Sequence, residues 1–211
     1  MKERPILFSG PMVRAILDGR KTQTRRIISP PHGYRWLDLD VGTLVNDGGD
    51  KKHVTDLPQR HGIAGDRLWV RETTYDVERN GYVGPVYVES DEGTHAAAWG
   101  WGESDDPDYI EPYELRKRPA IHMPRSMARI TLEVTGVHVE RLQDITEADA
   151  IAEGIGKTAA GFWSTYCRSD VDGTYSPRLS YQCLWDSLNA SRSFGWDVNP
   201  WVWVVEFAKS V

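Results

Sequence analysis

The sequence predicts a single α+β domain, a small mixed β-barrel with short flanking helices and long loop insertions. Two kinds of pattern support this fold class. Apolar and polar residues alternate over 128–142, and a strongly apolar run occupies 200–207, which is typical of strands. Helical spacing or capping signals mark short segments at 11–18, 144–155 and 180–190. A chain of 211 residues is long enough for one sizeable core.

The N-terminal segment predicts a strand, a helix and a second strand. Residues 6–8 (ILF) form the first short strand. Ser9 is a cap candidate, a proline follows at the first helical turn, and Gly19 ends the apolar spacing, so a helix is expected over 11–18. The β-branched, alternating run TQTRRII then predicts a strand, which places the basic cluster at a helix-to-strand junction.

Two stretches rich in Gly, Pro and polar residues are expected to be insertions into the one domain, residues 1–211. The first, 29–64, is expected to be irregular with at most one hairpin, and the second, 91–128, irregular throughout. Strands are predicted between them at 67–75 and 86–90. Four aromatic residues of the second insertion are candidates to cover a cleft: Trp99, Trp101, Tyr109 and Tyr113.

The last third of the chain carries the strongest signals. Gly136 interrupts the long strand at 128–142, which predicts a bulge or a sharp bend. Thr146 with Asp149 three residues later is a capping box at the start of the 144–155 helix. The apolar strand at 200–207 suits a barrel whose last strand closes against its first.

Composition narrows the class of protein. No apolar stretch has the length of a signal peptide or of a membrane span, which predicts a soluble, cytoplasmic protein with no membrane partner. The net charge of −6 argues against a protein that coats duplex DNA. Cys167 and Cys183 lack the spacing of a zinc site, so two reduced thiols, no metal and no cofactor are expected.

Local charge is more informative than the sum. Positive charge gathers at 20–26 and again at 116–129, whereas 103–111 is acidic. A local basic surface on an acidic chain suits a nucleoside, another small polar or anionic ligand, or a short segment of single-stranded RNA.

No familiar catalytic template is present: the sequence has no GxGxxG, Walker loop, GxSxG or HExxH, and its six histidines follow no pattern. The segment GRKTQTRR (19–26) stands out. Its cations either complement the helix C-terminus and decorate a strand, or form the floor of a polar pocket. Lys21 and Thr24 converge only if Lys21 lies in the turn before the strand begins.

The chain resembles the ASCH-domain family of the PUA-like superfamily. ILFSGPMVRAILDGRKTQTRR is similar to the opening of such proteins, GDRLWVRET to the following barrel strand, and ITLEVTGVHVERLQDITEADAIAEGI to the long strand and the helix after it. The ending, WDSLNASRSFGWDVNPWVWVVEF, resembles longer ASCH proteins often found in phages and prophages. These pieces cover roughly half of the chain, and the resemblance implies a PUA-like barrel related to RNA-modification modules.

The resemblance also implies an activity. One bacterial branch of the family comprises N4-acetylcytidine amidohydrolases that use a Lys, a Thr and a Glu, which fall on Lys21, Thr24 and Glu153 here. Glu153 can also be interpreted as a solvated helix residue before a glycine cap. Further substrate-binding candidates are Arg20, Arg25, Arg26, Trp69, Arg71 and Glu72.

Two schemes for amide hydrolysis remain open at this point. Either Lys21, with its pKa lowered by burial or by neighbouring cations, is the base for Thr24 or for a water, or Glu153 is the base and charged Lys21 stabilises the oxyanion; a direct Lys21–Glu153 pair favours the second. Two other functions compete with this hydrolase, namely a non-catalytic RNA-binding module and a ribonuclease acting at the same cleft.

Overall fold

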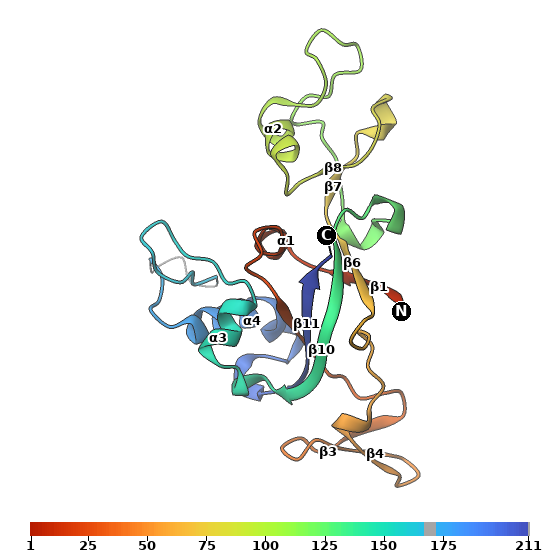
Figure 1. The fold of residues 1–211 in the computed structure, drawn as a ribbon, viewed down its shortest axis with the longest axis vertical. Helices are drawn as coiled ribbons and strands as arrows, with labels where there is room; N and C mark the ends of the chain where they lie inside the picture. Colours follow the sequence, from red (N-terminus) through yellow and green to blue (C-terminus); the bar gives the residue numbers. More distant parts are fainter. Residues whose placement is uncertain (167–171, 211) are drawn as a thin grey trace.

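The computed structural model describes residues 1–166 and 172–210 and shows a mixed α+β fold (Figure 1). Its main sheet has five strands, of which the first two are parallel and the other neighbours antiparallel. In spatial order these are β1 (Glu3–Leu7), β6 (Arg67–Arg71), β10 (Thr131–Arg141), β11 (Trp201–Lys209) and β2 (Gln23–Ile27).

The main sheet is open, with β1 and β2 at its edges, so the strands of the described residues do not close into a barrel by backbone pairing. The last strand, β11, pairs with β10 and β2, and the expectation that it closes against the first strand is wrong. The burial pattern explains this position. Residues 202–205 are buried on both sides of the strand, as in the interior of a sheet, whereas an edge strand is more often partly exposed.

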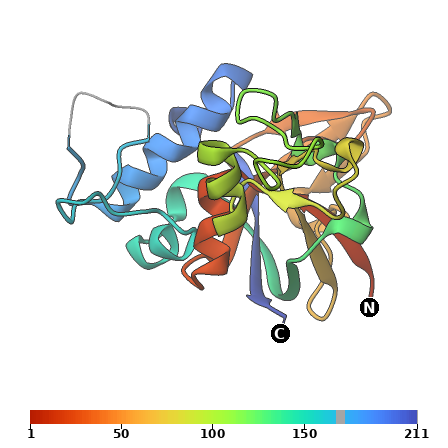
Figure 2. The same cartoon turned by 90° about the horizontal axis from the view of Figure 1, so that it is seen from above.

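Three helices cover one side of the main sheet: α1 (Gly10–Leu17), α3 (Glu147–Ala152) and α4 (Pro177–Asn189) (Figures 1 and 2). All three were predicted from the sequence. The capping box of α3 is formed, with the Thr146 side chain accepting from the backbone of Asp149 and the Asp149 side chain accepting in return. Ser9 occupies the N-cap of α1 without a side-chain capping bond, so the proline and the buried apolar face define that helix.

The long strand β10 bends where the sequence predicts. Its register with β11 shifts between Val134 and Gly136. A Cβ at Gly136 would lie 2.7 Å from the Glu206 carboxylate, so the absence of a side chain lets the two strands approach closely. The bulge at Gly136 is therefore confirmed.

The first insertion contains more structure than predicted. Residues 29–64 form a three-stranded antiparallel sheet of β3 (Tyr34–Asp38), β4 (Thr43–Asn46) and β5 (Lys51–His53), not a single hairpin. The third strand, KKH, is exposed throughout and has no apolar alternation to reveal it. Leu44 and Val54 anchor this small sheet to the main core.

The second insertion builds a lobe of its own, at the top of Figure 1. Residues 74–90, which precede the insertion, contribute β7 (Thr74–Tyr75) and β8 (Val86–Tyr87) to this lobe. The insertion itself contributes β9 (Lys117–Arg118) and α2 (Asp91–Trp99), and these elements surround a separate hydrophobic cluster. The prediction of an irregular 91–128 is wrong, because Ser90 caps a nine-residue helix. The predicted strand 67–75 is likewise divided between β6 and β7, which belong to different sheets.

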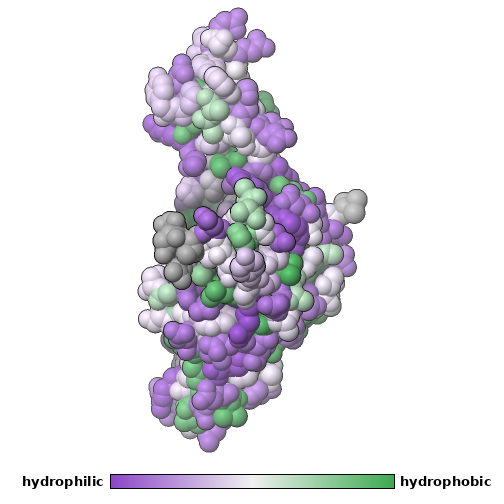
Figure 3. Space-filling view, turned by 90° about the vertical axis from the view of Figure 1, so that its left-hand side faces the viewer, coloured by the Kyte–Doolittle hydropathy of each residue, from purple (hydrophilic) through white to green (hydrophobic). Residues whose placement is uncertain are grey.

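Hydrophilic side chains dominate the face shown in Figure 3, with hydrophobic ones in small separate patches. Within residues 1–166 and 172–210, no helix is both long enough and apolar enough to cross a bilayer. Cys183 is a buried thiol on α4, and Cys167 lies outside the described residues.

Candidate active-site cavity

A cavity of about 600 Å³ lies beside β2, between the β1–α1 junction, the end of α3 and the inner face of α4. This volume is typical of pockets for small molecules. All three residues implied as catalytic by the sequence line it, namely Lys21, Thr24 and Glu153. Two segments more than 120 residues apart in the chain therefore meet at one hollow, as the sequence analysis requires.

The backbone fixes Lys21 in the turn between α1 and β2. Its N–H donates to the Ala15 carbonyl (2.9 Å), and the N–H of Thr22 donates to the Ala152 carbonyl at the end of α3 (2.9 Å). Gly154 permits this contact, because it has φ +84° and a Cβ there would lie 2.7 Å from the Lys21 Cβ. Lys21 thus precedes the strand, which is the condition for it to converge with Thr24.

The Lys21 ammonium is buried and fully hydrogen-bonded. Its Nζ donates to the Gln23 carbonyl (2.8 Å), the Glu153 carbonyl (2.7 Å) and Glu153 Oε2 (2.8 Å). Burial lowers the pKa of Lys21 from its ordinary value, while the charge and the hydrogen bond of Glu153 act in the opposite direction. Three acceptors match the three protons of an ammonium, so the geometry favours the charged form.

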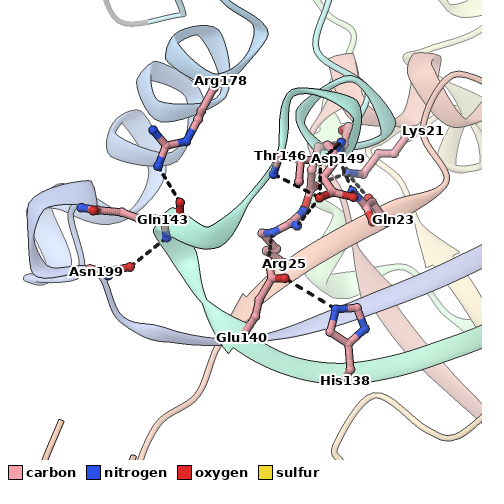
Figure 4. A network of polar contacts seen from close by, with 11 residues as sticks. Lys21, Gln23, Arg25, His138, Glu140, Gln143, Thr146, Asp149, Arg178 and Asn199 are labelled. Carbon is pink, nitrogen blue, oxygen red and sulfur yellow. Dashed lines mark hydrogen bonds and ion pairs between the residues drawn. The ribbon is translucent and has the colours of Figure 1, made fainter. Parts of the chain in front are cut away.

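The second oxygen of Glu153 is held by another cation. Arg25 Nη1 donates to Glu153 Oε1 (3.2 Å), and its Nε donates to Glu140 Oε1 (2.7 Å). Asp149 completes the surroundings of the guanidinium at 3.7 Å, and Figure 4 shows Arg25 between Glu140 and Asp149. The side chain of Glu153 is 4% exposed, so its interpretation as a solvated residue is wrong. A buried carboxylate of this kind needs both cations.

Thr24 differs from its neighbours in having an unused hydroxyl. It is buried on β2, where it pairs with Val205, and it lines the cavity. Within the described residues no hydrogen bond is made by its Oγ1, so the group is available to a molecule in the cavity. Lys21, Thr24 and Glu153 thus offer a cation, a hydroxyl and a carboxylate at one buried surface.

The inner face of α4 supplies side chains that the sequence analysis missed. Tyr181, Trp185 and Asn189 line the cavity and are buried. Burial raises the pKa of Tyr181 well above its ordinary value, so its phenol stays protonated and can donate a hydrogen bond. The helix was predicted, but spacing of four between aromatic residues is also typical of a core face, and no signal separates the two roles.

The wall of the cavity also contains three arginines and a histidine, namely Arg26, Arg60, Arg192 and His61. Only Arg26 was predicted. Arg60 and His61 belong to the first insertion and Arg192 to the turn after α4, where exposed arginines carry no recognisable pattern. The pKa of His61 is lowered to about 4 by burial and by the charges of Arg26, Arg60 and Arg4, so the imidazole is neutral near pH 7.

The other predicted substrate-binding residues lie elsewhere. Arg20 pairs with Asp18 at the surface, and none of Trp69, Arg71 and Glu72 lines the cavity. Trp69 and Arg71 stack on each other on β6, at 4.8 Å from guanidinium to ring centroid. Both oxygens of Glu72 bind Arg129 (3.1 and 2.8 Å). The placement of these four residues at the pocket is corrected. Trp69, Arg71 and Glu72 lie on β6 or directly after it, and β6 lies on the far side of β10 and β11 from β2. Arg20 instead lies in the turn before β2, where its side chain contacts Asp18.

The aromatic residues of the second insertion do not cover the cavity either. Trp99 and Tyr113 are exposed, at 71% and 84%, and Trp101 packs against Tyr82 within the upper lobe. None of the four aromatic candidates is among the lining residues. The prediction that they cover the cleft is wrong, because the insertion folds around its own hydrophobic cluster.

Neither a metal-binding group nor a similar protein helps to identify the ligand of the cavity. Among the described residues, no group of three or more His, Cys, Asp or Glu side chains is arranged to hold a metal ion. Comparison with protein-family models, with curated proteins and with solved structures gave no match.

Proposed function

We propose that the chain is an ASCH protein with a PUA-like fold that hydrolyses the amide of an N4-acylated cytidine. The observation that carries this proposal is the direct contact of Lys21 with Glu153, 132 residues away, in a cavity that also contains the unpartnered hydroxyl of Thr24. Amide hydrolysis needs an acceptor for the proton of the nucleophile and a cation or donor near the developing oxyanion, and these groups provide both.

The direct pair favours Glu153 as the base over Lys21. An ammonium whose three protons are all donated has no lone pair with which to accept another. Glu153 takes a proton from water as the water oxygen bonds to the acyl carbon. The C–N4 bond then breaks, the proton passes to N4, and the products are cytidine and the carboxylic acid.

The other groups have complementary roles in this scheme. Lys21 lies beside the carboxylate, where its positive charge stabilises the oxyanion of the tetrahedral intermediate. Thr24 Oγ1 orients the water or the acyl oxygen. The rings of Tyr181 and Trp185 form an apolar wall against which a pyrimidine can pack, and both are buried on α4.

The test is turnover of N4-acetylcytidine by the full chain, followed by chromatographic separation of cytidine. We expect release of cytidine and acetate, and a fall in kcat of about 100-fold or more in Lys21→Met, which keeps the length of the side chain but removes its charge. Lys52→Met on β5 is the matched control, because Lys52 is exposed and outside the cavity. No turnover by the unaltered chain, or equal kcat in Lys21→Met, contradicts the proposal.

The competing RNA-binding function receives less support from the charges. In the basic segment 116–129, Arg118 pairs with Asp76 and Glu78, and both Arg125 and Arg129 pair with glutamates. Cations that are already paired contribute little to phosphate binding. Arg116 and Lys117 of this segment have no ion pair among the described residues, but neither of them lines the cavity. Three arginines that also lack a carboxylate partner there, Arg26, Arg60 and Arg192, do line it, which favours a small ligand.

A further inference from the structure

We infer that the cavity takes its ligand as a nucleoside monophosphate, with the phosphate bound at the mouth by Arg60, Arg192 and Arg26. This inference rests on the proposed function only for the identity of the base. The phosphate is inferred from the positions and the ion pairs of the Lys and Arg residues that line the cavity.

The cavity has a large excess of positive charge. Five of its lining residues are Lys or Arg, whereas Glu153 is the one carboxylate among the described residues that line it. Lys21 and Arg25 are both paired with Glu153, and Arg25 also with Glu140. The remaining three arginines have no ion pair within the described part of the chain, and they are Arg26, Arg60 and Arg192.

Two of these arginines, Arg60 and Arg192, differ in exposure from the reacting groups, whereas Arg26 follows Thr24 by two residues on β2 and is partly buried. Lys21, Thr24 and Glu153 are each 3% exposed and form the floor of the cavity, whereas Arg60 and Arg192 are exposed. Arg60 comes from the first insertion and Arg192 from the turn after α4, so the two approach the mouth from different parts of the chain. A ligand with an uncharged amide at one end and an anion at the other matches this division.

Arg26 is partly fixed for such a contact. Its Nη2 donates to the Leu7 carbonyl (2.6 Å), and its guanidinium stacks over the Phe8 ring at 5.2 Å. These contacts hold the side chain without neutralising it. A guanidinium presents several donors in one plane, which suits the oxygens of a phosphate.

His61 lies next to Arg60 on the cavity wall, and its pKa is lowered to about 4, first by burial and further by the charges of Arg26, Arg60 and Arg4. The positive potential of these arginines, which opposes protonation of the imidazole, also favours an anion. A free nucleoside carries no charge near pH 7, so it gains no charge–charge attraction from this potential.

The size of the cavity favours a mononucleotide over an RNA chain. A volume of about 600 Å³ lies within the range that holds one small molecule, and the exposed arginines number two. RNA-binding surfaces instead extend a positive groove along several nucleotides.

The test compares cytidine with cytidine 5′-monophosphate by isothermal titration calorimetry on the full chain. We expect the monophosphate to bind about tenfold more tightly or better, with a preference that weakens as salt is raised. The ratio of the two affinities should fall about threefold or more in Arg60→Gln and in Arg192→Gln, and disappear in the double variant. Arg35→Gln is the matched control, because Arg35 is an exposed arginine paired with Asp47 outside the cavity.

Several outcomes overturn the inference: equal affinities for the two ligands, no binding of the monophosphate, or a preference that persists in the double variant. Tighter binding of a short RNA than of the monophosphate does so as well. Failure of the proposed function is seen separately. If all four ribonucleoside monophosphates bind at the arginines but N4-acetylcytidine is not hydrolysed, the activity is wrong and the phosphate site stands. If N4-acetylcytidine and its 5′-monophosphate are hydrolysed with the same kcat/KM, the activity stands and the phosphate site is wrong.

Discussion

Two ion pairs of this chain each hold a buried glutamate but differ in what surrounds them. Lys21–Glu153 joins the turn before β2 to the end of α3, and Arg129–Glu72 joins the segment before β10 to the residue after β6, with Arg129 itself exposed. The Glu72 side chain is fully buried, both of its oxygens bind one guanidinium, and it lines no described cavity. Glu153 instead faces a cavity and shares its two oxygens between two cations.

The difference shows that a buried carboxylate with a cationic partner is not by itself a site. Both pairs neutralise charge that would otherwise be costly to bury. Only one of them adjoins space for a ligand and a hydroxyl without a partner. Access to a cavity, together with burial of the cation, therefore separates the candidate catalytic pair from the structural one.

The sharpest way to break this comparison is to remove each carboxylate charge in turn. Glu153→Gln should lower the free energy of unfolding by about 3 kcal/mol, because it leaves the buried Lys21 without its carboxylate. Glu72→Gln should lower it by less, because the Arg129 that it leaves unpaired is exposed. Glu153→Gln should also lower kcat by about 1,000-fold, whereas Glu72→Gln should not. Urea unfolding and deacylation assays measure the two effects. Equal losses of kcat in both variants would mean that Glu153 acts only through stability.

The two buried threonine hydroxyls give a second comparison. Thr24 lines the cavity, and Thr74 is fully buried in the upper lobe with an Oγ1 that has no partner in the described residues. Thr24→Val should lower kcat about 100-fold and change the free energy of unfolding by less than about 1 kcal/mol. Thr74→Val should leave kcat unchanged and stabilise the fold slightly, since it removes an unsatisfied buried polar group. Unaltered turnover in Thr24→Val excludes any chemical role of its hydroxyl.

Two glycines with the same backbone conformation sharpen the comparison further. Gly154 (φ +84°) and Gly65 (φ +86°) differ in that a Cβ at Gly154 meets Lys21 and Ala15, whereas a Cβ at Gly65 meets nothing within 4 Å. Gly65→Ala should cost about 1 kcal/mol of backbone strain, and Gly154→Ala about 3 kcal/mol because steric overlap is added. Only Gly154→Ala should reduce kcat, since it displaces Lys21. Thermal unfolding and turnover of the two variants provide the check.

The last effect concerns the pH dependence of stability and leaves kcat out of account. His61 has a folded pKa of about 4 against an ordinary value of 6.5, so the unfolded chain binds more protons between these values. Its contribution to stability is complete above pH 6.5 and is lost as the pH falls to about 4, by at most about 3 kcal/mol. His61→Asn should flatten this part of the stability profile in urea titrations. An identical profile in the variant would show that His61 is not the group responsible.

The sequence was sufficient for the main elements and for the residues on the cavity floor. Alternation, capping signals and Gly136 predicted β10, α3 and β11, and the motif around Lys21 together with the family resemblance selected Thr24 and Glu153. The mouth of the cavity was not predictable, because Arg60 and Arg192 are exposed residues of irregular segments. Their position at one cavity follows from the tertiary fold and leaves no trace in local periodicity.

Sequence also failed where contacts within an insertion replace contacts with the main core. The strand β5 is three exposed residues without apolar alternation, and α2 is covered by a lobe with its own apolar cluster. Trp69, Arg71 and Glu72 were misplaced for a related reason. Their strand was identified, but its position across the sheet from β2 is a matter of topology.

The shortness of α3 has a consequence for how activity emerges during folding. A helix of six residues is too short to persist in an isolated chain, so the carboxylate at its end has no defined position until the helix docks on the turn after α1. Contacts between such distant parts of a chain form slowly because a long loop must close first. Recovery of the proposed hydrolase activity after dilution from denaturant should therefore report on a late step of assembly, after most helical signal has returned.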